Sequence, residues 1–176
     1  MNICVISDTH GNIGYLEKLN TIISGKIEIL IHLGDESSDV NGIINPGIKT
    51  ITVPGIYEHH YRNKNTARRI IETINNIKFL LTHTPYQTNS DLPGELTPEQ
   101  LSTTVNIVLF GHTHTPTIEI KNKILWINPG HIKSEYDRGN PASYCIINTN
   151  NPVSIKIYEL LTNNILLDYS YNIPNF

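Results

Sequence analysis

The sequence predicts a layered α/β protein, with a mixed sheet or two stacked sheets and helices on the outside. Strand-like and helical patterns alternate in the first part of the chain, whereas the last third holds strands separated by turns and no helical pattern. The chain has 176 residues, a length that fits one domain over residues 1–176 and can bury a sizeable core.

The strands of the first part are short apolar runs, which are typical of strands buried on both faces. We expect five of them, over residues 3–6, 28–33, 48–53, 77–82 and 107–110. Pro54-Gly55 ends the third, and a polar, Pro- and Gly-rich surface loop over residues 84–96 follows the fourth.

Helices are expected between these strands. Apolar residues recur at helical spacing over residues 13–23 and again over residues 66–74, where Arg68 and Arg69 would lie on the solvated face. A third, short helix begins at Thr97, because Pro98 suits the first helical position and Gln100 completes a capping box.

The last third has the pattern of an antiparallel unit. Residues 117–120 and 124–127 flank a Lys-Asn-Lys turn, which predicts a hairpin. Further strands are expected over residues 143–148, 153–159 and 165–169.

Composition excludes several classes of protein. The net charge is −3 and no long basic run exists, so we expect no nucleic-acid-coating surface. Cys4 and Cys145 lie in apolar runs and are interpreted as core residues of a reducing compartment, which favours a cytoplasmic protein. No stretch approaches the ~20 apolar residues of a membrane span, and we expect neither a signal peptide nor a membrane partner. The sequence is compatible with a homodimer.

Polar residues gather where the predicted strands end. All eight histidines fall at or near the carboxyl ends of predicted strands. These ends converge on one crevice in an open α/β sheet, which is the usual place for a functional site. The residues singled out by this position are Asp8, His10, His32, Asp35, Glu58, His59, His60, His83, His112, His114 and His131.

The spacing of these residues points to metal ions. Asp8 and His10, like His112 and His114, stand two residues apart, and such positions point to the same side of an extended chain. Imidazole and carboxylate ligands suit manganese, iron, zinc or nickel. With Asp35 and His83 added, two Asp and four His are too many for one tetrahedral ion and match a two-metal site.

With these motifs the sequence resembles the calcineurin-like metallophosphoesterase superfamily, and most closely its small single-domain bacterial and archaeal phosphodiesterase branch. The motifs are Asp8-Thr9-His10, Gly34-Asp35, Gly55-Ile56, His83 and Gly111-His112-Thr113-His114, in the family's order. The resemblance covers about residues 1–148. It implies a four-layer α-β-β-α sandwich of two mixed sheets with flanking helices.

The resemblance also implies a role for each matching residue. Asp8, His10 and His114 would hold one ion, Asp35 would bridge, and His83 and His112 would hold the second. The cofactor would be two divalent ions, manganese first, with iron, nickel or zinc as alternatives.

The third motif departs from the family. The family's asparagine, a ligand of the second ion, is replaced by Ile56, which cannot coordinate. Glu58 is a replacement candidate, and His59 or His60 could serve instead or contact the substrate; alternatively the second site is weak or empty. Tyr57 stands where some members have a histidine that protonates the leaving group, so His59 is a candidate for that catalytic role. His131, where the family often has serine, is interpreted as structural.

The implied activity is hydrolysis of a phosphate ester, a diester more than a monoester, by a hydroxide held between the two ions. Arg138 is a candidate substrate-binding residue, because its guanidinium matches a phosphate, although a surface ion pair with Asp137 or Glu135 is the preferred interpretation. The alternative function is a catalytically weak binding or scaffold module on the same fold.

Overall fold

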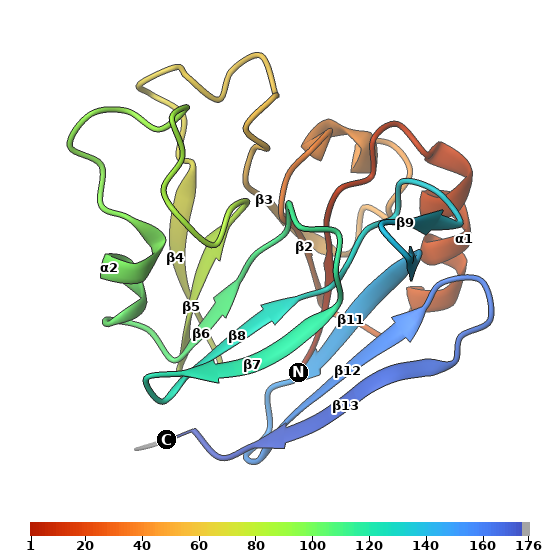
Figure 1. Cartoon of the computed structure of the whole chain (residues 1–176). Coiled ribbons are helices and arrows are strands. Elements are labelled where there is room, and N and C mark those ends of the chain that lie inside the picture. Colours follow the sequence, from red (N-terminus) through yellow and green to blue (C-terminus); the bar gives the residue numbers. More distant parts are fainter. Residues whose placement is uncertain (174–176) are drawn as a thin grey trace.

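The computed structural model describes residues 1–173 and is built around two sheets, shown in Figure 1. The first sheet has the strand order β13-β12-β11-β1-β2-β3 and the second has the order β4-β5-β6-β8-β7. The strands of the first sheet are β1 (Asn2–Ile6), β2 (Ile29–His32), β3 (Lys49–Thr52), β11 (Ser143–Asn148), β12 (Val153–Glu159) and β13 (Ile165–Tyr171). Those of the second are β4 (Arg69–Ile74), β5 (Ile77–Thr82), β6 (Ile107–Leu109), β7 (Thr117–Lys121) and β8 (Ile124–Asn128).

Both sheets are mixed, and the parallel strands form one half of the first sheet and the centre of the second. In the first sheet β1, β2 and β3 run parallel, while β11, β12 and β13 are added in antiparallel pairing. In the second, β5, β6 and β8 run parallel, with β4 and β7 antiparallel at the edges. A separate ribbon pairs β9 (Tyr136–Asp137) with β10 (Asn140–Pro141).

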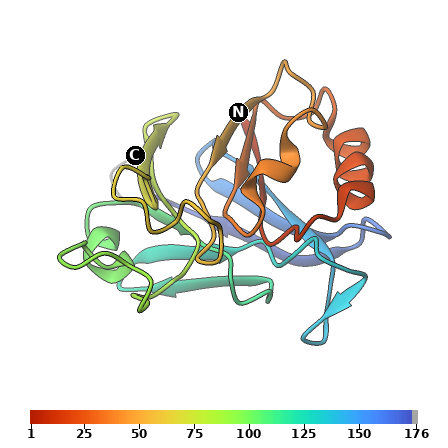
Figure 2. The same cartoon turned by 90° about the horizontal axis from the view of Figure 1, so that it is seen from above.

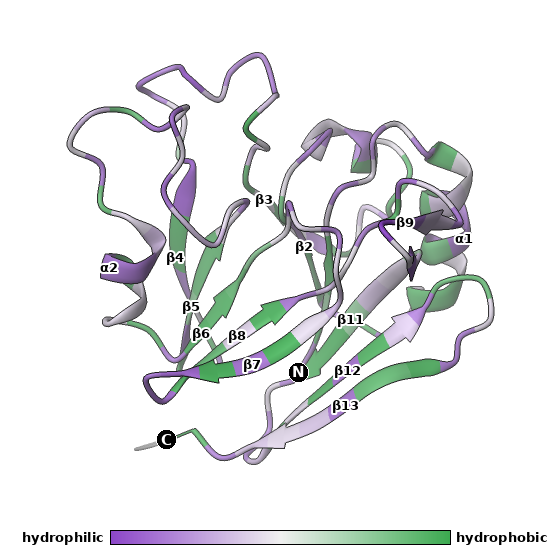
Figure 3. Ribbon diagram, viewed as in Figure 1, coloured by the Kyte–Doolittle hydropathy of each residue, from purple (hydrophilic) through white to green (hydrophobic). Residues whose placement is uncertain are grey.

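The main core lies between the two sheets. Buried side chains from β1, β2, β11 and β12 meet those of β5, β6 and β8, with Phe79 among the largest that are fully buried. In Figure 3 the hydrophobic residues gather on these central strands, whereas the loops at the top of the view are mostly hydrophilic.

Helices cover the outer faces, so the predicted order of layers is confirmed. The helix α1 (Ile13–Ile23) buries Leu16, Leu19 and Ile23 against the first sheet, beside the 3-10 helix η1 (Ser37–Val40). The second sheet carries α2 (Pro98–Ser102), which has the predicted capping box at Thr97. Figure 2 shows α1 and α2 on opposite sides of the molecule. The helical layers are thin, and no helix in the described part of the chain is long and apolar enough to cross a membrane.

The predicted helix over residues 66–74 is wrong, because this segment contains β4. Ile70 and Ile74 share a helical face with Ala67 and Ile71, but they also alternate at strand spacing, and both pack on the main core. The turn that follows decides between the two structures. Asn75 and Asn76 both have positive φ, at 49° and 63°, as a two-residue type I′ hairpin requires.

The assignment of Arg68 and Arg69 to a solvated helix face is also corrected. The Arg68 and Arg69 side chains are 2% and 6% exposed, and they form ion pairs with Glu95 and Asp91. These pairs fasten the loop over residues 84–96 to the start of β4, because both acids belong to that loop.

Candidate metal centre

The candidate site lies where the parallel strands of both sheets end. The loops after β1 and β2 in the first sheet meet those after β5 and β6 in the second, towards the top of Figure 1. Backbone hydrogen bonds link neighbouring loops within each sheet. The Asp8 amide donates to the Gly34 carbonyl at 2.9 Å, and the Gly111 amide donates to the His83 carbonyl at 2.9 Å. Side chains then connect the two sheets.

The six residues of the predicted metal site come together in two groups that share Asp35. In each group, one ligand atom from every residue lies within 4.8 Å of the others. The first group holds Asp8, His10, Asp35 and His114, and the second holds Asp35, His83 and His112. This is the same division that the family resemblance implies.

The side chains of each group point at one another. In the first group His114 Nε2 lies 3.1 Å from Asp8 Oδ1 and 3.4 Å from His10 Nε2. In the second, His83 Nε2 lies 3.4 Å from Asp35 Oδ1, and the rings of His83 and His112 are 5.1 Å apart. The other Asp35 oxygen, Oδ2, lies 3.7 Å from His10 Nε2. Asp35 therefore presents one oxygen to each group.

Strained backbone marks the two groups. Every member except His83 has a left-handed φ, a conformation that costs a non-glycine residue about 1–2 kcal/mol. The angles are 55° at Asp8, 48° at His10, 58° at Asp35, 66° at His112 and 59° at His114. Such strain persists only where surrounding structure over-determines it, so these loops hold their side chains in place.

Two positions in the predicted motifs require glycine, because neighbouring atoms lie too close for a side chain. A Cβ at Gly55 would lie 1.9 Å from Asp35 Oδ1, and one at Gly111 would lie 1.9 Å from Ser7 Oγ. Both glycines thus let backbone pass directly beside the cluster.

Hydrogen bonds outside the groups orient the ligand atoms. The His83 Nδ1–H donates to the Leu33 carbonyl at 2.8 Å, and the His114 Nδ1–H donates to Asp137 at 2.5 Å. Each imidazole then presents Nε2 to its group, as in metal-binding histidines. The His112 backbone amide donates to Asp8 Oδ2 at 2.9 Å and ties the loop after β6 to the loop after β1.

Burial and neighbouring charges set the protonation of these residues. Burial alone would raise the pKa of Asp8, but the adjacent imidazoles of His114 and His83 outweigh it and lower that pKa to about 2. Burial raises the pKa of the Asp35 carboxyl. Burial lowers the pKa of His112, and the nearby His83 adds to the effect. Asp8 is thus ionised, and the lowered pKa of His112 favours its neutral form; both are metal-binding forms. Burial alone would lower the pKa of His114, but its hydrogen bonds with Asp8 and Asp137 outweigh burial and raise that pKa.

The residues present fit divalent cations. Asp8 Oδ1, Asp35 Oδ1 and His83 Nε2 are buried and have no hydrogen-bond partner in the described part of the chain. Buried polar atoms almost always have a hydrogen-bond partner, so three unpaired atoms in one cluster require an explanation. A mixed set of carboxylate and imidazole atoms from several loops suits a borderline divalent ion.

The structure does not bring Glu58 or His59 into either group. The Glu58 carboxylate accepts hydrogen bonds from the Gly55 amide at 2.7 Å and from the Ser37 amide and hydroxyl at 3.1 and 2.7 Å. It therefore ties the loop after β3 to η1. His59 is exposed on that loop. Their ligand and catalytic roles stay predictions.

Arg138 and His131 lie beside the site. Arg138 Nη1 donates to the carbonyls of His112 and Thr113 at 3.3 and 3.1 Å, and Nε lies 3.7 Å from Asp137. The phosphate-binding role of Arg138 stays a prediction. His131 is fully buried, its Nε2 lies 3.1 Å from the Asn140 carbonyl, and its ring lies 5.5 Å from that of His114.

Sequence reasoning did not identify Asp137 as part of the site. This residue lies in the ribbon of β9 and β10, which has no motif spacing relative to His114. The contact exists only because the chain folds the ribbon back onto the loop after β6, so no local signal could have found it.

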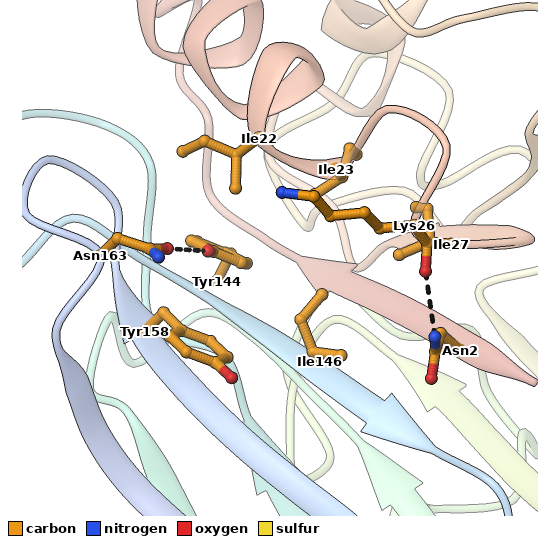
Figure 4. A pocket seen from close by; sticks show the side chains of 9 residues that line it. All are labelled: Asn2, Ile22, Ile23, Lys26, Ile27, Tyr144, Ile146, Tyr158 and Asn163. Atoms are coloured by element: carbon orange, nitrogen blue, oxygen red, sulfur yellow. Dashed lines mark hydrogen bonds between the residues drawn. The ribbon is translucent and has the colours of Figure 1, made fainter.

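Two hollows differ in their relation to the cluster. A small one of about 110 Å³ is lined by His10, Asp35, Glu36, Tyr57 and Glu58 and reaches the first group. A larger one of about 230 Å³, shown in Figure 4, lies between the end of α1 and the strands β11 and β12. It includes the stacked rings of Tyr144 and Tyr158 and none of the six cluster residues.

Comparisons with known proteins show the family of this chain. Residues 1–152 match the model of the calcineurin-like phosphoesterase superfamily domain. A curated relative, the probable metallophosphoesterase MJ0623 of Methanocaldococcus jannaschii, is 30% identical over 135 residues, which are 74% of this chain and 67% of the relative.

Solved structures share the fold. The phosphoesterase YfcE of E. coli superposes with a TM-score of 0.73 at 21% identity, over 98% of this chain and 100% of YfcE. An archaeal phosphodiesterase superposes with a TM-score of 0.66 at 24% identity, over 89% of this chain and 99% of that one. With the family match spanning most of its length, this chain belongs to the calcineurin-like phosphoesterase superfamily.

Proposed function

We propose that this protein is a phosphodiesterase that uses two divalent metal ions, with manganese as the favoured ion. The observation that carries the proposal is the pair of groups sharing Asp35, with buried and otherwise unsatisfied ligand atoms in both. The similar archaeal structure, which is named a phosphodiesterase, supports a diester as the substrate.

Two ions held there would supply Lewis-acid chemistry, which generates hydroxide at neutral pH and stabilises charge on a phosphoryl group. The chain's own contribution is placement. Asp35 presents one oxygen to each group, and the left-handed loops hold both groups before any substrate arrives. The side chain of His10 is 31% exposed and lines the small hollow, so this edge of the cluster is open to a phosphate ester.

The wild-type protein should hydrolyse bis-p-nitrophenyl phosphate faster than p-nitrophenyl phosphate when loaded with Mn²⁺. EDTA should abolish this activity and Mn²⁺ should restore it. Asp35→Asn removes the negative charge common to both groups, so we expect kcat/KM to fall by at least about 100-fold, together with the bound Mn²⁺.

Asp168→Asn is the matched control, because Asp168 is an exposed carboxylate on β13 that pairs with Lys156 at 3.1 Å and lies outside both groups. It should keep full activity. A monoester preference would contradict the diesterase assignment, and an active, Mn²⁺-loaded Asp35→Asn variant would contradict the site.

The second candidate function is a binding module with weak catalysis. It is favoured by Ile56, which leaves the second group with three protein ligands against four in the first. Full Mn²⁺ loading of the wild type without hydrolysis of either ester would support this function over the phosphodiesterase.

A further inference from the structure

The ribbon of β9 and β10 contacts the metal-binding loop through two adjacent residues. Asp137 accepts the hydrogen bond from His114 Nδ1, and Arg138 binds the carbonyls of His112 and Thr113. Both contacts fall on the loop after β6, which supplies one histidine to each group. The ribbon therefore braces this loop from outside the cluster.

The contact between Asp137 and His114 decides which imidazole nitrogen faces the group. The His114 Nδ1–H donates to Asp137 Oδ2 at 2.5 Å, which holds a proton on Nδ1 and fixes the orientation of the ring. Nε2 is thereby aimed into the first group, where it lies 3.1 Å from Asp8 Oδ1 and is the ring nitrogen available to an ion. A carboxylate in this position also raises the basicity of a ligating imidazole.

No other histidine of the two groups has such a partner in residues 1–173. His83 donates to a neutral carbonyl, that of Leu33. The His112 ring has no hydrogen bond in the described part of the chain, and it lies beside the rings of His83 at 5.1 Å and Tyr86 at 6.1 Å. The carboxylate support is thus confined to the first group, which also has one more ligand than the second.

We propose that Asp137 is a positioning residue that makes the group of Asp8, His10, Asp35 and His114 the tighter of two unequal cation sites. The inference rests on the proposed function in taking both groups as metal sites. Its consequence is stepwise loading: the first group fills at low metal concentration, and the second fills only at higher concentration.

Isothermal titration of the metal-free full chain with Mn²⁺ tests this without any turnover. The wild type should bind two ions in separate steps. Asp137→Asn should weaken the tighter step by roughly 10–100-fold, as loss of an outer partner of a metal ligand does, and leave the weaker step within about twofold. Asp168→Asn, an exposed and ion-paired carboxylate away from the site, should change neither step.

A second measurement separates positioning from a general effect on folding. In the metal-free protein, the His114 Nδ1–H proton should give a hydrogen-bonded, slowly exchanging NMR signal in the wild type, and this signal should be lost in Asp137→Ala. Asp137→Glu should restore part of the tighter binding, because it returns a carboxylate to the same ribbon.

The outcomes distinguish this inference from the proposed function. Unchanged tight binding in Asp137→Asn, or a loss confined to the weaker step, overturns the role of Asp137. Weakened binding in a protein that hydrolyses no ester supports the role of Asp137 and overturns the phosphodiesterase proposal. A wild type that binds no Mn²⁺ overturns both.

Discussion

At the scale of single residues, Glu58 shows how a candidate ligand can serve another purpose. It follows Gly55 by three residues, where a replacement for the missing asparagine would be sought, yet both of its oxygens already accept hydrogen bonds. Its side chain is 8% exposed, so these bonds are not shared with bulk water. The two backbone amides that it satisfies, of Ser37 and Gly55, belong to η1 and to the loop after β3.

Glu58→Ala is therefore expected to lower the free energy of unfolding by about 2 kcal/mol, because it leaves partly buried amides without an acceptor. The Mn²⁺ stoichiometry should stay that of the wild type. Urea unfolding and metal analysis would measure the two effects separately.

Glu58→Gln is the matched control, since its amide oxygen can still accept from both backbone amides. It should retain most of the stability. Loss of Mn²⁺ binding in Glu58→Gln with stability retained would instead identify Glu58 as a ligand.

At the scale of elements, the hairpin of β4 and β5 shows how a turn decides between two structures. The pairing register places Ile74 opposite Ile77, so Asn75 and Asn76 alone make the turn. The Asn75 side chain also bonds Thr149, whereas no side-chain hydrogen bond of Asn76 is found in the described part of the chain. Asn76 is thus the position where the conformational requirement can be tested by itself.

Asn76→Ala should destabilise the protein by about 1 kcal/mol, because alanine is strained at a φ of 63°. Asn76→Gly should be neutral or stabilising, since glycine is favoured at the second position of a type I′ turn. Thermal or urea unfolding of the two variants measures the difference, and equal stabilities would argue against a type I′ turn.

Most elements could be predicted from the sequence because their patterns are local. Strands such as β2 and β6 are short, largely apolar runs, and α2 has its capping box, so each is specified by neighbouring residues. The segment over residues 66–74 fits helix and strand spacing equally well, and the hairpin turn that pairs it with β5 settles the choice. Asp137 and Glu58 support the site from outside the two groups. Their roles depend on contacts between segments far apart in the chain, which leave no pattern in the sequence.

At the scale of the whole molecule, the site is a product of two sheets rather than one. Parallel strands of both sheets end at the same place, so strand-end residues could be predicted to meet without knowing the loops. The loops that flank the site are in turn held by a second cluster of charges. Asp91 pairs with Arg69 at 2.6 Å and accepts a hydrogen bond from Tyr61, which joins residues 54–68 to residues 84–96.

This cluster should make stability depend on pH through Asp91. Burial alone would raise the pKa of Asp91, but hydrogen bonds from Thr88, Tyr61 and Arg69 outweigh it and lower that pKa below its ordinary value. A carboxyl whose pKa is lowered in the folded state contributes stability above its unfolded pKa, near 4, and loses it as the pH falls through the folded value.

Asp91→Asn should therefore cost about 3 kcal/mol at pH 7, since it leaves Arg69 buried without its closest carboxylate. The difference between wild type and variant should shrink as the pH falls below about 4, because the wild-type carboxyl is then protonated as well. Urea unfolding in EDTA at several pH values measures this difference with the metal sites removed from the comparison. A difference that stays constant from pH 7 to pH 3 would show that the Asp91 charge does not hold these loops together.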